Sequence, residues 1–252
     1  MPRTPKGGTG RFSFCYTKAM YTRILLKISG EQLQGKYTNG FDAERAIWIA
    51  NEIKKIETAE VVVMVGGGNY VRGAQLAGNG IGRVTADNIG MLGTIMNAVA
   101  LADVFNDVGL PSQALTNITA DQVADPFTHR RAVSHMKKGR VVIVGGGIGR
   151  PYLTTDTAAV SLALELGCNV ILKATKVDGV YDKDPMKDDG AQKYHTITLR
   201  EAVEKPDIKV MDKAAIALAY DHQLPLVIFD LLGEGNIAKA ARGETTGTTV
   251  HP

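Results

Sequence analysis

The sequence predicts an α/β protein, a three-layer sandwich in which helices cover both faces of a central, mainly parallel sheet. Short apolar runs rich in Val and Ile alternate along the chain with longer segments of helical periodicity. Strands that are separated by helices need crossover connections, and these produce a parallel sheet covered on both faces. The chain has 252 residues with 44% hydrophobic content, so it can bury the core of such a fold.

The predicted elements follow one another in a regular order. Strands are expected at residues 24–28, 61–65, 141–144, 170–172 and 226–229. Helices are expected at residues 41–57, 87–108, 155–166 and 210–222. The first of these helices carries apolar residues at helical spacing, namely Ile47, Ala50, Ile53 and Ile56. The second is apolar along its length, and residues 176–194, with five Asp, are expected to form an extended polar loop.

The positive charge of the chain is concentrated in its N-terminal segment. Residues 1–21 contain four basic residues and no acid, so the 25 basic and 26 acidic residues that remain leave the rest close to neutral. A nucleic-acid surface needs clustered Lys and Arg on one face, and the sequence therefore predicts no nucleic-acid partner. No stretch approaches the roughly 18 apolar residues of a membrane helix, which predicts no membrane partner.

The cysteine content and the N-terminus bear on location and domain organisation. Cys15 and Cys168 are the only cysteines, too few for a disulfide framework or a thiolate metal site, which favours a reducing, cytoplasmic location.

Residues 22–252 are expected to form a single domain, and residues 1–21 a disordered basic tail or a segment outside the true start. A targeting peptide and a nucleic-acid arm are alternatives for this tail. A translation start placed too early is favoured, because Met20 directly precedes the first strand.

Three strand ends run directly into unusual sequence. The first ends in Lys27, Ile28, Ser29 and Gly30, the second in Gly66 to Gly68, and the third in Gly145 to Gly149. Without a Cβ, backbone N–H groups can approach an anion closely, and a following helix adds further unpaired N–H groups. Neither glycine run matches the dinucleotide-binding or P-loop fingerprint. Because ligands of parallel sheets bind at the carboxyl ends of the strands, we expect phosphates at this edge and phosphoryl transfer as the chemistry.

Single residues at these ends have both functional and purely structural interpretations. Lys27 lies in an apolar strand, where a charge needs a partner or a ligand, although a surface-facing edge position is the alternative. Asp156 follows two threonines and could equally be part of a helix cap. Arg72 could hold a phosphate or lie in solvent, and Asp87 and Asp212 each stand near the start of an apolar helix.

Seven segments together resemble the bacterial UMP kinases, a branch of the amino acid kinase family. They are KISGE at 27–31, GGGNYVRG at 66–73, GMLGTIMN at 90–97, TTD at 154–156, LKATKVDGVY at 172–181, DP at 184–185 and KVMD at 209–212. The similarity runs from about residue 23 to residue 248, with the segments in the family's order. An ordered series of this kind is far more specific than any single glycine loop.

The resemblance implies transfer of the γ-phosphoryl group of ATP to UMP, giving UDP for pyrimidine nucleotide biosynthesis. It also implies a homohexamer and Mg²⁺ held mainly through nucleotide phosphates, without a metal site of the protein itself. The implied ATP-binding residues are Lys27, Ile28, Ser29, Gly30, Gly68, Arg72, Thr175, Tyr181 and Asp184. The implied UMP-binding residues are Gly67, Asp87, Ile148, Gly149, Arg150, Pro151, Tyr152, Leu153, Thr154 and Thr155. Among them, the resemblance implies that the Asp87 carboxylate binds the ribose. Near the reacting groups the resemblance places Lys27, Asp156, Lys173 and Asp212.

Two positions depart from the family pattern. The family usually has Thr-Gly-Asn-Pro where this chain has residues 148–151, so Ile148 and Arg150 replace a hydroxyl and an amide. On the long helix, relatives activated by GTP carry basic residues where this chain has Ala102 and Asn106. The sequence therefore predicts altered contacts to the acceptor and no activation by GTP.

Two other functions compete with this interpretation. A different enzyme of the same family, acting on acetylglutamate, aspartate or carbamate, would share the lysine and the glycine loops. A nucleotide-binding storage or regulatory protein without catalysis would share the fold, since a fold does not determine a function. Residues 90–97 and 211–212 favour the UMP branch over the first alternative. The intact Lys27, Asp156 and Asp184 weigh against the second.

Overall fold

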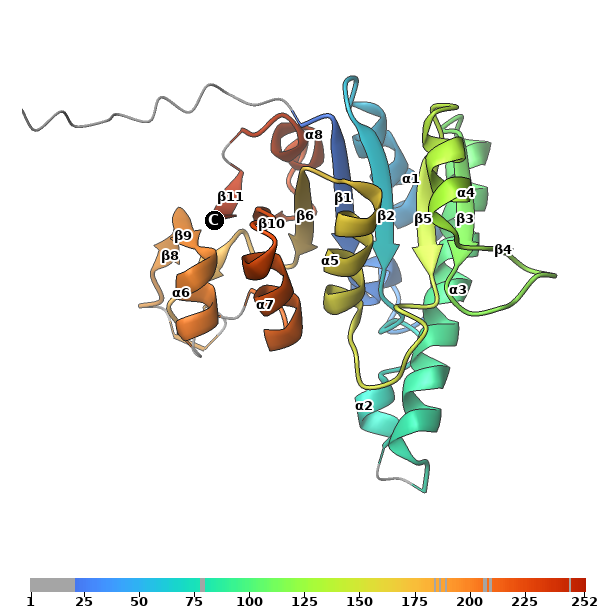
Figure 1. Ribbon diagram of the computed structural model, residues 1–252, viewed down its shortest axis with the longest axis horizontal. Helices are drawn as coiled ribbons and strands as arrows, with labels where there is room; N and C mark the ends of the chain where they lie inside the picture. Colours follow the sequence, from blue (N-terminus) through green and yellow to red (C-terminus); the bar gives the residue numbers. More distant parts are fainter. Residues whose placement is uncertain are drawn as a thin grey trace, which may run out of the picture.

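The computed structural model describes residues 21–77, 80–183, 185, 187–188, 190–205, 208, 210–244 and 246–252. Its centre is a nine-stranded sheet in the order β4-β3-β5-β2-β1-β6-β10-β11-β9 (Figure 1). All neighbouring strands pair in parallel except β10 and β11. The predicted fold class is therefore confirmed, with an antiparallel edge that the sequence analysis did not predict.

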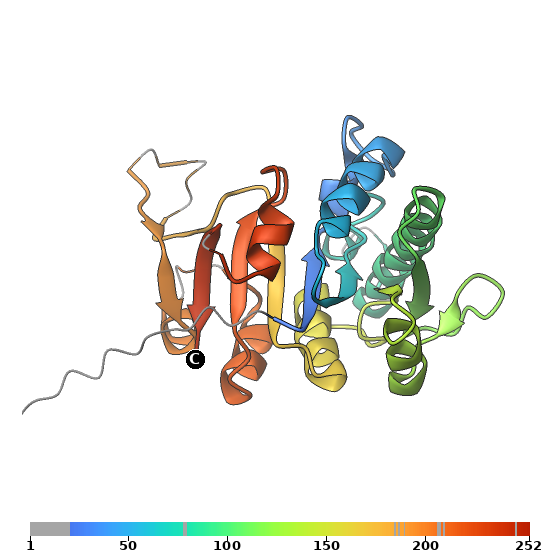
Figure 2. The same ribbon diagram turned by 90° about the horizontal axis from the view of Figure 1, so that it is seen from above.

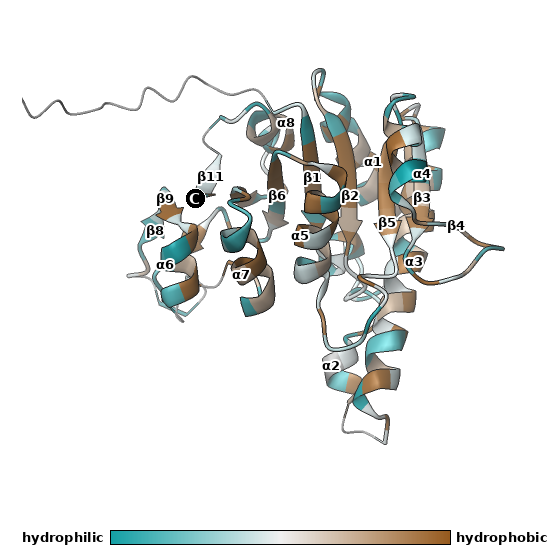
Figure 3. Ribbon diagram, viewed as in Figure 1, coloured by the Kyte–Doolittle hydropathy of each residue, from teal (hydrophilic) through white to brown (hydrophobic). Residues whose placement is uncertain are grey.

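The strands are short and most are apolar, as Figure 3 shows for the brown strands in the middle of the molecule. Those of the main sheet are β1 (Arg23–Ile28), β2 (Glu60–Val65), β3 (Ser112–Thr116), β4 (Asp125–Pro126), β5 (Val141–Gly145), β6 (Val170–Thr175), β9 (Thr196–Thr198), β10 (Leu226–Asp230) and β11 (Gly247–His251). A second, two-stranded sheet consists of β7 (Val180–Tyr181) and β8 (Lys193–Tyr194). The segment predicted as one extended loop thus contains an antiparallel ribbon.

Helices cover both faces of the sheet, as the view from above shows (Figure 2). One core lies under α1 (Ala43–Lys54), α3 (Arg83–Asp107) and α8 (Asn236–Ala241). The other lies under α4 (His129–Met136), α5 (Thr155–Leu166), α6 (Leu199–Glu204) and α7 (Lys213–Asp221). Two short helices, η1 (Gly30–Gln34) and α2 (Gly73–Leu76), follow β1 and β2. Alternate side chains of each central strand enter the two cores, as expected for a strand buried on both faces.

The longest of these helices, α3, extends beyond the edge of the sheet, with α2 beside it (Figure 1). By length and composition alone it could cross a membrane, contrary to the expectation from the sequence that no stretch approaches a membrane helix. In the structure α3 packs against β3, β5 and α1, and half of its apolar window is buried inside the protein. It is therefore a core helix, and its inner face supports the strand ends described below.

Candidate active site

The carboxyl ends of β1, β2 and β6 meet at one edge of the sheet. Lys27 on β1 lies opposite Met64 on β2 and Lys173 on β6. The loops that follow β1 and β2 are in direct contact, since a Cβ on Gly30 would lie 2.6 Å from the backbone nitrogen of Gly68. Only glycine permits this approach. The edge therefore presents closely spaced backbone groups, as the sequence predicts.

Asp156 lies between two lysines at this edge. Its carboxylate oxygens are 2.7 Å from Lys27 Nζ and 2.8 Å from Lys173 Nζ. Lys27 is only 7% exposed and lies on a central strand, so the alternative that it is a surface-facing edge residue is wrong. The N-terminus of α5 presents Asp156, where Thr154 caps the helix by accepting a hydrogen bond from the Asp156 backbone N–H at 3.0 Å. The capping and ion-pair interpretations of this segment therefore both hold.

Burial and charge act in opposite directions on the carboxylate in this cluster. Burial alone would raise the pKa of Asp156, but the positive charges of Lys27 and Lys173 outweigh it and hold the pKa below its ordinary value. Burial lowers the pKa of Lys173, and Asp156 opposes that shift. Asp156 is consequently ionised at neutral pH, which suits it to hold two ammonium groups and makes it a poor proton acceptor.

The third glycine loop, after β5, has a backbone that needs glycine. Gly146, Gly147 and Gly149 all have positive φ angles, and a Cβ on Gly146 would lie 2.9 Å from the backbone nitrogen of Asn117. Tyr152 in the same segment also has a positive φ, of 68°, which is strained for a residue with a side chain. Its N–H donates to Asp87 Oδ2 at 2.8 Å. The loop is therefore held in one conformation next to α3.

Asp87, predicted to bind ribose, lies in α3 and faces this loop. Besides the Tyr152 N–H, it accepts a hydrogen bond from Arg83 Nε at 2.8 Å. The Arg83 guanidinium in turn lies 5.0 Å from the centre of the Tyr152 ring. Asp87 thus joins the predicted acceptor loop to α3, and a role in ribose binding stays a prediction.

The carboxylate of Asp212 is the N-cap of α7, where it accepts from the Ala215 N–H at 2.9 Å. It also accepts hydrogen bonds from the hydroxyls of Thr154, the N-cap of α5, and of Thr157 in α5. The structure therefore places Asp212 at the junction of two helix N-termini. Lys173 Nζ donates to the carbonyl of Val210, two residues before Asp212, at 2.7 Å. The backbone of this segment therefore links Asp212 to the lysine cluster.

Arg72 forms an ion pair with Glu31, a residue that the sequence analysis did not select for any role. Glu31 also lies 3.2 Å from Lys176 Nζ, and its side chain packs over Gly68. Glu31 therefore connects the segments that follow β1, β2 and β6.

The other predicted donor residues lie at or beyond the ends of β1 and β6. The hydroxyl of Thr175 donates to the backbone carbonyls of Val177 and Phe229. The hydroxyl of Tyr181 donates to Asp178 at 2.6 Å. Ile28 is buried at the end of β1, and Ser29 is the N-cap residue of η1. Asp184 lies outside the described residues, so its predicted role is neither supported nor contradicted.

The two residues that depart from the family pattern have different surroundings. Ile148 lines a cavity of about 210 Å³ together with Phe127 and Leu162, and it packs against the core under α5. Arg150 is exposed and donates to the carbonyl of Gly149 at 3.0 Å. Leu153 is also exposed, whereas Pro151 and Thr155 are partly buried. The loop therefore leaves several of the predicted acceptor residues accessible to a ligand.

Comparison with known proteins identifies the family. The model of the amino acid kinase family matches residues 22–230. The chain belongs to the amino acid kinase family. Its fold is the one that the resemblance to this family predicts.

Relatives and solved structures of amino acid kinase family members cover nearly the whole chain. A uridylate kinase of Dichelobacter nodosus (strain VCS1703A) is 43% identical over 236 residues, 93% of this chain and 98% of that protein. The crystal structure of UMP kinase from Bacillus anthracis has a TM-score of 0.87 and 39% identity, covering 92% of this chain and 97% of its own. The crystal structure of UMP kinase from Ureaplasma parvum has a TM-score of 0.86 and 32% identity, and the match covers 92% of this chain and 99% of that one.

Several polar residues that shape the site of this family member were missed by sequence reasoning. They are Glu31, Asn69, Thr94, Asn97, Thr157 and Lys176. The detectable signal was strongest for Thr94 and Asn97, because polar side chains one turn apart interrupt an otherwise apolar run of α3. No comparable signal marked Glu31, since an acidic residue at a strand end is ordinary.

Proposed function

We propose that this chain transfers the γ-phosphoryl group of ATP to UMP, giving ADP and UDP. The observation that carries the proposal is the pairing of the buried Lys27 and the partly buried Lys173 with Asp156 beside glycine loops at one sheet edge. Similarity to enzymes named uridylate kinase and UMP kinase over more than nine tenths of the chain supports the choice of acceptor. The product is a precursor of the other pyrimidine nucleotides, and the proposed location is the cytoplasm.

The proposed mechanism rests on positioning and charge. The acceptor is a phosphate with a second pKa of about 6, so near neutral pH it attacks without losing a proton to the protein. Backbone N–H groups of Gly30 and Gly68 hold the donor phosphates, and Lys27 and Lys173 offset the charge that spreads over the transferred group. Asp156 keeps both ammonium groups in place. The N-terminus of α5 directs its unpaired N–H groups toward the acceptor phosphate.

Mg²⁺ fits this site as a companion of the nucleotide. No group of three or more potential metal ligands occurs among the residues that the structure describes, and Asp156 is already paired with two lysines. An ion held mainly by phosphate oxygens is consistent with this donor set. When bound, Mg²⁺ would neutralise charge on the phosphates.

An acceptor panel separates this proposal from its alternatives. The purified protein is incubated with ATP and, separately, with UMP, CMP, acetylglutamate and aspartate, and ADP formation is followed in a coupled assay. UMP should give the highest kcat/KM. Preference for an amino acid acceptor would place the chain in another branch of the family, and no ADP with any acceptor would indicate a non-catalytic protein.

Arg150 is proposed to contact the acceptor phosphate or a neighbouring acid when UMP is bound. The side chain is exposed in the acceptor loop, and Gly149 provides its only hydrogen bond among the described residues. We expect Arg150→Asn to raise the KM for UMP severalfold with little change in the KM for ATP. An unchanged KM for UMP in steady-state kinetics would remove Arg150 from the site.

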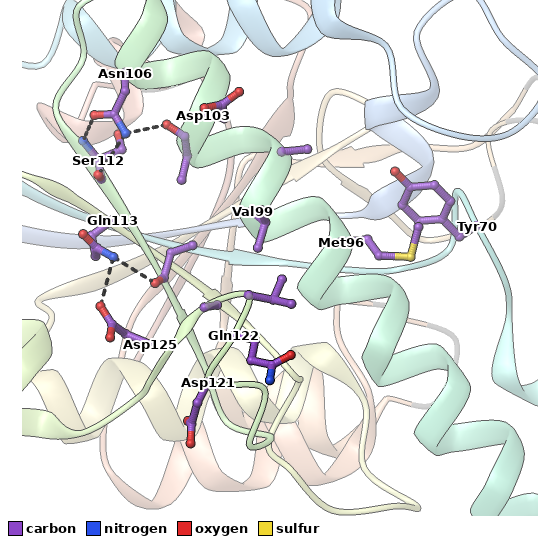
Figure 4. Close-up of a pocket in the computed structure, with 15 residues that line it drawn as sticks. Tyr70, Met96, Val99, Asp103, Asn106, Ser112, Gln113, Asp121, Gln122 and Asp125 are labelled. Carbon is purple, nitrogen blue, oxygen red and sulfur yellow. Dashed lines mark hydrogen bonds between the residues drawn. The ribbon is translucent and has the colours of Figure 1, made fainter.

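GTP is expected to have no activating effect. A cavity of about 780 Å³ lies between α3 and the segment that joins β3 to β4 (Figure 4). Its lining includes Ala102 and Asn106, where GTP-activated relatives carry basic residues. The described lining contains Asp103, Asp121 and Asp125 but no Lys, Arg or His. A triphosphate would be repelled there, so adding millimolar GTP to the standard assay should leave the rate unchanged; a severalfold stimulation would contradict this.

We also propose that residues 22–252 act as a single domain and assemble into a homohexamer, as the family resemblance implies. Val84, Leu92 and Met96 on α3 are large apolar side chains exposed in the single chain, which supports assembly through this helix. Light scattering of the purified protein should give six times the mass of one chain. A monomeric mass at micromolar concentration would contradict the hexamer.

A further inference from the structure

The segment 90–97 of α3 carries two buried polar side chains for which the proposed mechanism has no role. Thr94 is 2% exposed and Asn97 is fully buried. They lie one helical turn apart and face the strand ends. Burying an amide or a hydroxyl is unfavourable unless its hydrogen bonds are satisfied, so the partners of these two side chains indicate what they do.

Asn97 holds the glycine loop after β2. Its Nδ2 donates to the carbonyl of Gly66 at 2.7 Å. It also exchanges two hydrogen bonds with Asn69, of 2.7 and 2.8 Å, and Asn69 in turn donates to the carbonyl of Gly40. Gly66 and Asn69 flank Gly67 and Gly68, so Asn97 fixes both ends of the loop that is predicted to meet the donor phosphates.

Thr94 holds the glycine loop after β5. Its hydroxyl accepts a hydrogen bond from the N–H of Gly146 at 2.7 Å and donates to the Met91 carbonyl at 2.6 Å. The second bond orients the hydroxyl so that its lone pair faces Gly146. Thr94 therefore fixes the start of the loop that is predicted to meet the acceptor.

The helix backbone also touches both loops directly. A Cβ on Gly67 would lie 2.7 Å from the carbonyl oxygen of Gly90, and a Cβ on Gly145 would lie 2.8 Å from the Cα of Ile95. Contacts this close leave no room for the loops to slide over the helix. Both loops are therefore seated on the same two turns of α3.

We propose that Thr94 and Asn97 are positioning residues that set the donor and acceptor phosphate loops at a fixed distance and orientation to each other. The inference rests on the proposed function, which assigns Gly68 of the loop after β2 to the donor phosphates and the loop after β5 to the acceptor. In-line transfer needs the two phosphates aligned, and a displacement of about 1 Å can cost about 100-fold in rate. Loss of either side chain should therefore reduce kcat more than it weakens the binding of either nucleotide.

The decisive comparison is Thr94→Val against Thr94→Ser. Valine keeps the shape of threonine but cannot accept the hydrogen bond from Gly146, whereas serine keeps the hydroxyl. We expect Thr94→Val to lower kcat by about 10-fold or more, with the KM values for ATP and UMP close to those of the wild type. Thr94→Ser should restore most of kcat. Thr85→Val, at an exposed position of the same helix, is the matched control and should behave as the wild type.

Asn97→Ala provides a second test that does not depend on how Thr94→Val folds. It removes the hydrogen bonds to Gly66 and Asn69, and kcat should fall with both KM values nearly unchanged. Because both side chains act on the same relative placement, the double variant should lose less than the product of the two single losses. Melting temperature and circular dichroism identify the folded variants.

Two results would overturn the inference: a folded Thr94→Val or Asn97→Ala protein with wild-type kcat, or a Thr94→Ser protein as impaired as Thr94→Val. Failure of the proposed function is distinguishable, because it would appear in the wild-type protein as an absence of transfer from ATP to UMP.

Discussion

Lys27→Ala is expected to keep the fold and to lose about 100-fold or more in kcat, since removing one preorganised donor typically costs about 3 kcal/mol in the barrier. The fold should survive because Asp156 keeps Lys173 as a partner at 2.8 Å when Lys27 is gone. In the proposed mechanism the positive charge of Lys27 offsets negative charge on the phosphoryl group in transfer. The loss should therefore appear in kcat, measured with ATP and UMP both saturating. Steady-state kinetics and a melting curve of the variant check the two parts of this prediction.

Lys137→Ala is a suitable control for this variant. Lys137 is exposed at the C-terminal end of α4, on another part of the molecule, and its removal should change neither kcat nor the melting temperature measurably. Near-normal turnover in Lys27→Ala would exclude Lys27 from the chemistry and with it the proposed site.

Asp156→Asn should damage both stability and catalysis. The change leaves the buried Lys27 and the partly buried Lys173 as two cations without the carboxylate between them. Removing one partner of a buried ion pair typically costs about 3–5 kcal/mol. Because the amide cannot hold both ammonium groups in place, kcat should also fall by about 100-fold. Urea denaturation measures the first effect, and the nucleotide assay measures the second.

The pH dependence of stability tests the same carboxylate. The folded protein holds the pKa of Asp156 below its ordinary value of 3.8, so this group contributes stability that is fully present above that value. The contribution is lost as pH falls through the lower folded pKa. The difference in unfolding free energy between the wild type and Asp156→Asn should therefore be constant near neutral pH and shrink below about pH 4.

Glu60→Gln is the matched control for Asp156→Asn. Glu60 pairs with Arg23 at the amino-terminal ends of β1 and β2, the ends away from the candidate site. Both side chains are partly exposed there. Exposed pairs contribute at most about 1 kcal/mol, so stability should change little and kcat not at all. If Asp156→Asn were no more harmful than Glu60→Gln, the carboxylate would have no special role between the two lysines.

The parts of the fold that could be predicted were those with strong local signals. The helix expected at residues 155–166 has those bounds in the structure, because Thr154 caps its start and Gly167, in the left-handed region, ends it. The central strands were recognised because burial on both faces makes them continuously apolar. Strand β3, with the sequence SQALT, was missed because polar residues interrupt its apolar run. Strand β11 was missed because it is rich in Thr and Gly.

For the candidate site, the sequence indicated which residues carry charge but not how they are held. The burial of Lys27 and the glycine contacts followed from residue types at strand ends. The pairing of Glu31 with Arg72 and Lys176 joins three loops that are distant in sequence, so no local pattern could reveal it. The capping role of Asp212 was foreseen as one of two possibilities, but its hydrogen bonds to α5 depend on tertiary packing.

The central claim is that the glycine-rich strand ends hold two nucleotides side by side for direct phosphoryl transfer between them. The most direct test uses ATP labelled in its γ-phosphate, unlabelled UMP and Mg²⁺, with separation of the products during the first turnovers. The label should appear in the β-phosphate of UDP in amounts equal to the ADP formed. Release of the label as inorganic phosphate, with no labelled UDP, would contradict the proposal.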